Sequence, residues 1–130
     1  MLSFDESANF LDEVADSLPE ILFRDLNGGV SIVDYPKHKG NGMMVLGEYT
    51  RSREMGRYIT IYFGSFRRVF SHLSDEDLKK KLKEVLVHEL THHNEALAGC
   101  RDLEIKDALQ QQRYNETGEF IPTRDIKIRG

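Results

Sequence analysis

The chain has 130 residues, of which 39% are hydrophobic and 31% are charged, a composition typical of one soluble globular domain with its own core. The net charge of −4 leaves no basic surplus for nucleic acid, and the single cysteine excludes an intrachain disulfide. An acidic N-terminus and the lack of an apolar run of about 20 residues predict a cytoplasmic protein that does not bind a membrane.

The first part of the chain has a helical pattern. Apolar residues recur at helical spacing in residues 3–18, with acidic residues between them, and Pro19 follows. This pattern predicts an amphipathic helix that ends before the proline. Residues 20–26 remain apolar and predict a short helical turn before Gly28.

The middle of the chain has the pattern of short strands. Residues 30–33, 43–50 and 57–63 are predicted strands, and residues 37–42, which hold two glycines, are a predicted loop. Bulky side chains alternate on both faces of residues 57–63. We therefore expect this strand to pair on one side only and to offer its other edge to an extended peptide.

A long helix dominates the second half of the sequence. Residues 66–73 predict a short helix, and Ser74 followed by three acidic residues predicts the start of a longer one. Leucines continue at helical spacing through residues 75–98, and Gly99 is a typical C-terminal stop. The expected fold class is therefore α+β, with a small sheet that supports this helix.

The C-terminal part of the chain is predicted less fully. Residues 102–114 predict a further helix, and residues 115–130 are polar and fit either a strand or a tail. We expect one domain over residues 1–114 and a C-terminal tail over residues 115–130. Cys100 is interpreted as an ordinary loop thiol rather than a metal ligand.

The long helix contains the sequence H-E-x-x-H, formed by His88, Glu89 and His92. Residues four apart lie on the same face of a helix, so both imidazoles can bind one Zn²⁺. Glu89 is offset by about 100° and can reach a metal-bound water without being a ligand. The motif therefore predicts a zinc-dependent hydrolase in which Glu89 is the general base.

A catalytic zinc site requires a third protein ligand, and the sequence offers several candidates. Glu95 shares the helical face of the two histidines, whereas Asp102 and Glu104 follow the stop at Gly99 and can fold back. His93 projects about 100° away from His92 and is interpreted as a packing residue, or as one that supports the ligands without binding the metal. His38 and His72 are interpreted as surface histidines.

These features resemble the small bacterial zincin-like metallopeptidases, sometimes called minimal metalloproteases. The resemblance extends from about Phe10 to about Tyr114. It implies a zincin-like fold in which a short mixed β-sheet packs on helices, an H-E-x-x-H active-site helix, and zinc-dependent peptidase activity on a peptide or protein substrate. The matching segments are Asp16–Pro19, Arg57–Phe63 and Leu86–His93.

The resemblance also bears on the third ligand. The family pattern places a glycine soon after the second histidine and an aspartate three residues later, which here corresponds to Gly99 and Asp102. An extra turn at 94–97 moves Asp102 about 6 Å further along the helix. Asp102 is thus the third ligand that the resemblance implies, and Glu95 and Glu104 remain alternatives.

The best interpretation of the sequence is a zinc metallopeptidase with His88 and His92 as metal ligands and Glu89 as general base. Two alternatives stay open. The same chemistry would allow a metal-dependent hydrolase of a non-peptide amide, and the scaffold would also suit a non-catalytic zincin-fold binding protein.

Overall fold

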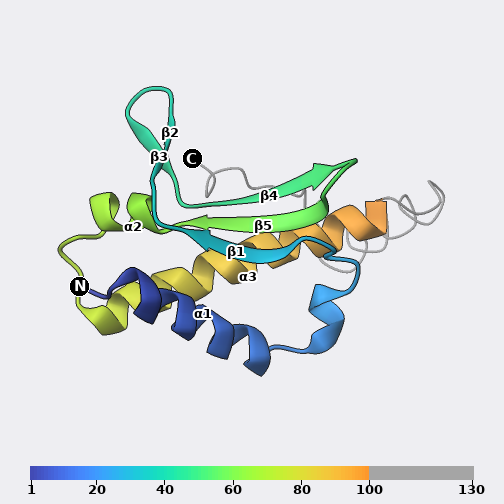
Figure 1. The fold of residues 1–130 in the computed structure, drawn as a ribbon, viewed down its shortest axis with the longest axis horizontal. Coiled ribbons are helices and arrows are strands. Elements are labelled where there is room, and N and C mark those ends of the chain that lie inside the picture. Colours follow the sequence, from blue (N-terminus) through green and yellow to red (C-terminus); the bar gives the residue numbers. More distant parts are fainter. Residues whose placement is uncertain (100–130) are drawn as a thin grey trace, which may run out of the picture.

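The computed structural model describes residues 1–99, in which a three-stranded sheet lies over two helices (Figure 1). This arrangement confirms the predicted α+β class. None of the helices within residues 1–99 has the length and apolarity that crossing a bilayer requires. The elements, in chain order, are α1 (Phe4–Ser17), η1 (Glu20–Phe23, a 3₁₀ helix), β1 (Gly29–Val33), β2 (Lys37–Lys39), β3 (Met43–Val45), β4 (Gly47–Ser52), β5 (Gly56–Tyr62), α2 (Phe63–Val69) and α3 (Asp75–Gly99).

Helix α1 begins with a capping box. The Ser3 hydroxyl accepts a hydrogen bond from the Glu6 backbone N–H at 3.0 Å, and the Glu6 carboxylate accepts one from the Ser3 N–H at 2.9 Å. These two bonds satisfy N–H groups that the first turn leaves without helical partners, and they lower the pKa of Glu6. The helix and the short η1 turn confirm the predictions for residues 3–18 and 20–26.

The main sheet has the order β1-β5-β4 and is mixed, because β5 pairs parallel with β1 and antiparallel with β4. The prediction that residues 57–63 form an edge strand was wrong, because β5 has a partner on each side. The alternating residues of β5 instead lie on the two opposite faces of the sheet. Ile59 and Ile61 are fully buried on the face toward α3, while Tyr58 and Thr60 occupy the opposite face. The edges of the described sheet are β1 and β4.

The region between β1 and β4 differs from the prediction. Residues 37–42 are not simply a loop, because β2 pairs antiparallel with β3 in a hairpin. Its turn places Asn41 (φ 68°) and Gly42 (φ 74°) in the left-handed region. The single strand predicted over residues 43–50 is interrupted at Leu46, whose carbonyl accepts a hydrogen bond from Tyr62 N–H at 2.9 Å. Before Leu46 the chain forms β3 and pairs with β2, and after Leu46 it forms β4 and pairs with β5.

Helix α2 follows β5 without a loop, three residues earlier than predicted. Its first turn is buried, and Gly64 is required there. A Cβ atom on Gly64 would lie 2.4 Å from the backbone nitrogen of Pro36. The absence of a side chain thus allows the helix to contact the segment that leads into β2.

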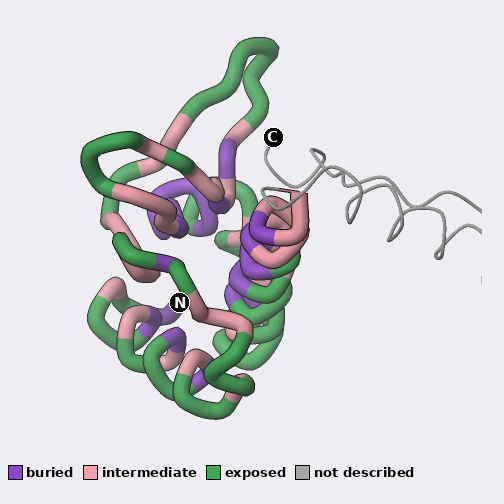
Figure 2. The backbone as a smooth tube through the Cα atoms, turned by 90° about the vertical axis from the view of Figure 1, so that its right-hand side faces the viewer, coloured by how far each residue is buried: buried purple, intermediate pink, exposed green. Residues whose placement is uncertain are grey.

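Helix α3 confirms the predicted helix over residues 75–98. Ser74 provides the N-terminal cap, since its hydroxyl accepts a hydrogen bond from Asp77 N–H at 3.2 Å. The buried positions of α3 face the sheet and α1, and the exposed ones face solvent (Figure 2). Its buried residues are Leu78, Leu82, Val85, Leu86, Glu89, Leu90, His93 and Leu97.

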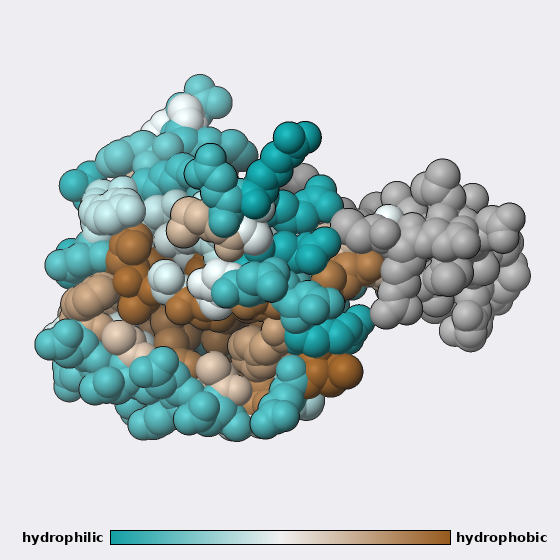
Figure 3. Space-filling model, turned by 45° about the vertical axis from the view of Figure 1, so that its right-hand side comes forward, coloured by the Kyte–Doolittle hydropathy of each residue, from teal (hydrophilic) through white to brown (hydrophobic). Residues whose placement is uncertain are grey.

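The core lies between α3, α1 and the inner face of the sheet. On the face drawn in Figure 3, hydrophobic residues gather in the middle, between hydrophilic residues above and below. Partly buried apolar side chains border this core; they are Phe4, Phe10, Leu18, Phe23, Val30, Ile32, Leu46, Tyr49 and Phe70.

Candidate metal centre

The two histidines of the H-E-x-x-H sequence meet on one face of α3. The Nε2 atoms of His88 and His92 lie 3.0 Å apart, and their rings are nearly perpendicular, with centroids separated by 4.6 Å. Both side chains are half-buried at the margin of the core. The structure therefore directs the same nitrogen of each ring toward a common point.

This geometry fits zinc. Two ring nitrogens bound at 2.0–2.1 Å to one tetrahedral Zn²⁺ would be separated by about 3.3 Å. The observed separation of 3.0 Å differs from that by only a few tenths of an ångström. Imidazole nitrogen is also a preferred zinc ligand. His88 and His92 are thus suited to hold the metal as a pair.

Glu89 lies between the two histidines in sequence and is fully buried. Strand β4 passes close above it at Gly47. A Cβ atom on Gly47 would lie 3.5 Å from Glu89 Cγ and only 2.6 Å from Val85 Cγ1. Helices that serve only packing place apolar residues at such positions, because burying a carboxylate is costly. A buried glutamate beside two converging imidazoles therefore marks this turn as a candidate catalytic site.

His93 has a different environment from its neighbours. It is fully buried, its Nε2 lies 2.7 Å from the Arg24 carbonyl oxygen, and its Nδ1 lies 2.9 Å from the Tyr49 hydroxyl. Since a carbonyl can only accept, Nε2 carries the proton, and in the neutral ring Nδ1 accepts from Tyr49. Burial, together with the nearby Arg57 and Arg24 charges, lowers the pKa of His93 and favours this neutral form. Both ring nitrogens thus bond within the protein, in agreement with the structural role predicted for His93.

Residues 1–99 show no third metal-binding side chain beside the histidine pair. Within that range, no group of three His, Cys, Asp or Glu side chains is arranged to hold a metal ion. Glu95 borders a groove of about 440 Å³ between α3 and η1. Asp102, Glu104 and Cys100 lie outside the described residues, as do the predicted helix 102–114 and the tail 115–130.

The remaining histidines, His38 and His72, are exposed, in agreement with their predicted surface role. A shallow groove of about 500 Å³ also runs along α3 up to His88. Its described lining residues are Lys80, Lys83, Glu84, Val87, His88 and Thr91.

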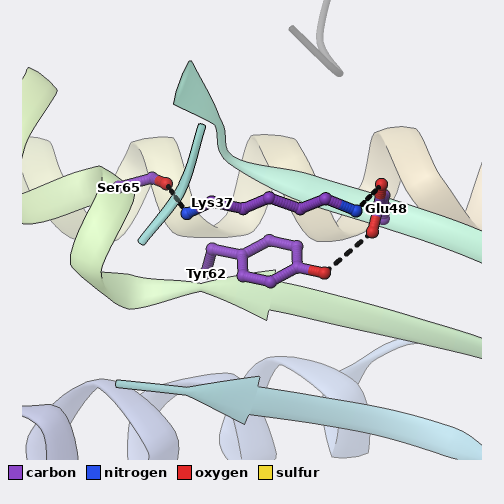
Figure 4. A network of polar contacts seen from close by, with 4 residues as sticks. All are labelled: Lys37, Glu48, Tyr62 and Ser65. Carbon is purple, nitrogen blue, oxygen red and sulfur yellow. Dashed lines mark hydrogen bonds and ion pairs between the residues drawn. The ribbon is translucent and has the colours of Figure 1, made fainter. Parts of the chain in front are cut away.

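The outer face of the sheet carries a polar network that sequence reasoning missed (Figure 4). Glu48 on β4 accepts hydrogen bonds from the Lys37 ammonium at 2.6 Å and from the Tyr62 hydroxyl at 2.8 Å. The backbone N–H of Lys37 donates to the buried Ser65 hydroxyl at 3.1 Å. Burial, followed by the hydrogen bond to Glu48, raises the pKa of Tyr62. The network fastens β2 to the sheet, and no local sequence pattern indicates it.

Comparison with known proteins agrees with this picture. No curated protein matches the chain. Among solved structures, a conserved hypothetical protein from Thermus thermophilus is 29% identical, with a TM-score of 0.67 over 76% of this chain and all of that one. A model of the zincin-like metallopeptidase family matches residues 37–111, which include the histidine pair and more than half of the chain. The chain therefore belongs to the zincin-like metallopeptidase family.

Proposed function

We propose that this protein is a zinc-dependent peptidase in which His88 and His92 bind the metal and Glu89 is the general base. The observation that carries the proposal is one turn of α3, where two imidazole Nε2 atoms lie 3.0 Å apart beside a fully buried glutamate. Asp102 is the proposed third ligand, and Glu95 and Glu104 are the alternatives.

The proposed chemistry divides between the metal and the chain. When bound, Zn²⁺ would polarise the substrate carbonyl and lower the pKa of water toward 7. Glu89 accepts a proton from the attacking water and later donates it to the leaving amine. Its buried position beneath β4 keeps bulk solvent away from that proton transfer.

Among the described residues, β4 pairs with β5 on one side only, and we place the substrate at its other edge. Gly47 of β4 packs over Val85 and Glu89. At about 100° per residue, His92 and His88 lie further around α3, on the side of Val85 away from Glu89, which places them beyond the edge of β4. An extended peptide paired with β4 would therefore lie along the same side of α3 as the histidine pair. This role replaces the one predicted for residues 57–63.

The decisive experiment compares Glu89→Gln with the control Glu84→Gln. Glu84 is exposed on the same helix, where it pairs with Lys81. Glu89→Gln should retain zinc and reduce peptide cleavage by about 10²–10⁴-fold. Glu84→Gln should retain both zinc and activity.

Three outcomes would contradict the proposal. Unchanged cleavage by zinc-loaded Glu89→Gln would exclude Glu89 as the base. Equal zinc content in wild type, His88→Ala and His92→Ala would exclude the ligand pair. A zinc-loaded wild type that cleaves no member of a peptide library would favour the binding protein, or, if it cleaves other amides, the non-peptide hydrolase.

A further inference from the structure

The two residues that follow His92 both bind the segment around η1. His93 Nε2 donates to the Arg24 carbonyl at 2.7 Å, and the Asn94 side-chain amide donates to the Leu22 carbonyl at 3.0 Å. Asp25, which follows Arg24, has a φ of 60°, so the chain turns sharply directly after the accepting carbonyl. The turn of α3 that carries His92 is thus tied on one side to a short, sharply folded segment.

On its other side, the same turn is tied to β4. The Tyr49 hydroxyl lies 2.9 Å from His93 Nδ1, and the two rings meet edge to face with centroids 5.2 Å apart. His93 therefore bridges the strand and the η1 segment through a single ring. Because the ring is fully buried, water does not compete for either of these hydrogen bonds.

These contacts place β4 and α3 in register. Gly47 lies over Glu89, and Tyr49, two residues later on the same strand face, contacts His93, four residues after Glu89. Two strand residues advance about 6.8 Å, and four helical residues advance about 6 Å. The strand and the helix therefore run side by side in the same direction and advance together, as Figure 1 also shows.

We propose that His93 is a positioning residue, which fixes the rotation of α3 so that the His88–His92 pair faces the edge of β4 opposite β5. This inference rests on the proposed function and extends it. The separation of the two histidines depends on α3 alone, because both lie on that helix. Their placement relative to a substrate on β4 depends on what joins the helix to the strand, and beside the packing of Gly47 this includes the hydrogen bond between His93 and Tyr49.

Tyr49→Phe tests this role, because it removes one hydroxyl and keeps the ring. The matched control is Tyr58→Phe, which makes the same change on β5, on the opposite face of the sheet from α3. We expect zinc affinity to stay within about twofold, since both histidines are retained. Amide exchange in β4 should become about fivefold faster, corresponding to the loss of one net hydrogen bond of about 1 kcal/mol.

Two further measurements separate positioning from a general structural role. With Co²⁺ bound in place of zinc, the pseudocontact shifts of the β4 amides should change in Tyr49→Phe and stay constant in Tyr58→Phe. For a cleaved peptide, kcat should fall by about 10-fold or more at nearly constant zinc content, because a misplacement of about 1 Å at a reacting centre can cost 10²-fold. His93→Gln keeps an N–H donor for the Arg24 carbonyl. Its loss of kcat should therefore lie between the losses in Tyr58→Phe and Tyr49→Phe.

The inference and the proposed function fail separately. A wild type that binds zinc and cleaves nothing removes the proposed function, whereas the exchange rates and pseudocontact shifts still decide the positioning role. If Tyr49→Phe and Tyr58→Phe give the same exchange, the same Co²⁺ shifts or the same kcat, His93 does not position the histidine pair. Loss of zinc binding in Tyr49→Phe would also overturn the inference, because the effect would then act on the ligands themselves.

Discussion

The two halves of α3 bury different kinds of residues along one continuous stripe. Its first half buries only apolar side chains, such as Leu82 and Leu86, whereas its second half buries Glu89 and His93. These four positions follow one another at spacings of four, three and four residues, so the helical pattern is unbroken. The first half is thus explained by packing alone. The second half buries two ionisable groups among its leucines, at the turn where two histidines converge, and packing alone does not account for them.

The largest expected effect is a difference in the free energy of unfolding between variants in the first and second halves of α3. Leu82 is fully buried in the first half, so Leu82→Ala should destabilise the protein by about 2–5 kcal/mol in urea unfolding. It should leave zinc stoichiometry unchanged below the transition. His88→Ala should do the reverse, with zinc lost and the apo protein changed by no more than about 1 kcal/mol. Equal stability losses in the two variants would remove the distinction between the halves.

Removal of the metal tests whether the second half depends on it for folding. If zinc binds only the folded state, chelation should lower stability by the mass-action term, about 2.7 kcal/mol when free zinc is 100 times its Kd. The apolar stripe of the first half should still hold the apo fold together. Complete unfolding on chelation, seen by circular dichroism, would identify a structural zinc site instead of a catalytic one.

The contact between β4 and the second half can be tested at Gly47. A Cβ there would lie 2.6 Å from Val85 Cγ1 and 3.5 Å from Glu89 Cγ, so Gly47→Ala should cost about 1–3 kcal/mol and displace the strand. Gly40→Ala is the control, because no atom of the described residues, apart from its chain neighbours, lies within 4 Å of its Cβ position. Similar melting temperatures for the two variants would show that β4 does not pack closely on α3.

The smallest effect concerns the beginning of the first half. Ser74→Ala removes the hydroxyl that caps α3 and should destabilise the fold by about 1 kcal/mol. Zinc affinity and cleavage should not change, since the cap lies more than three turns before His88. A change in zinc affinity larger than the change in stability would mean that the halves are coupled along the helix.

Sequence reasoning succeeded where the signal is local. The leucine stripe, the cap at Ser74 and the four-residue histidine spacing all lie within a few turns of one helix, and α3 has the predicted extent. The family match over residues 37–111 likewise agrees with the resemblance. The α+β class was predicted correctly, because short strands between helices favour it, and the family resemblance implied the mixed sheet.

Features that depend on distant residues could not be predicted. The partners of His93 are 44 and 69 residues away in sequence, and no periodicity links them. The alternation in residues 57–63 distinguishes the two faces of a strand but does not indicate which strands pair with it. It therefore wrongly predicts that β5 lies at an edge of the sheet. Strands of three residues, such as β2 and β3, are too short to establish a period, and their hairpin was predicted as a loop.

The mixed pairing of β5 also has a consequence for how the protein folds. Strands β4 and β5 are joined by a tight turn, in which the Ser52 hydroxyl accepts hydrogen bonds from the backbone of Glu54 and Met55. Such a hairpin closes locally and rapidly. The parallel partner β1 must instead pair Gly29 with Tyr58 across the whole intervening chain, a slower step with a larger loop-closure entropy. Arg24 lies just before β1, so the carbonyl that fixes His93 is expected to arrive with this late step, and the histidine pair reaches its final orientation only when the sheet is complete.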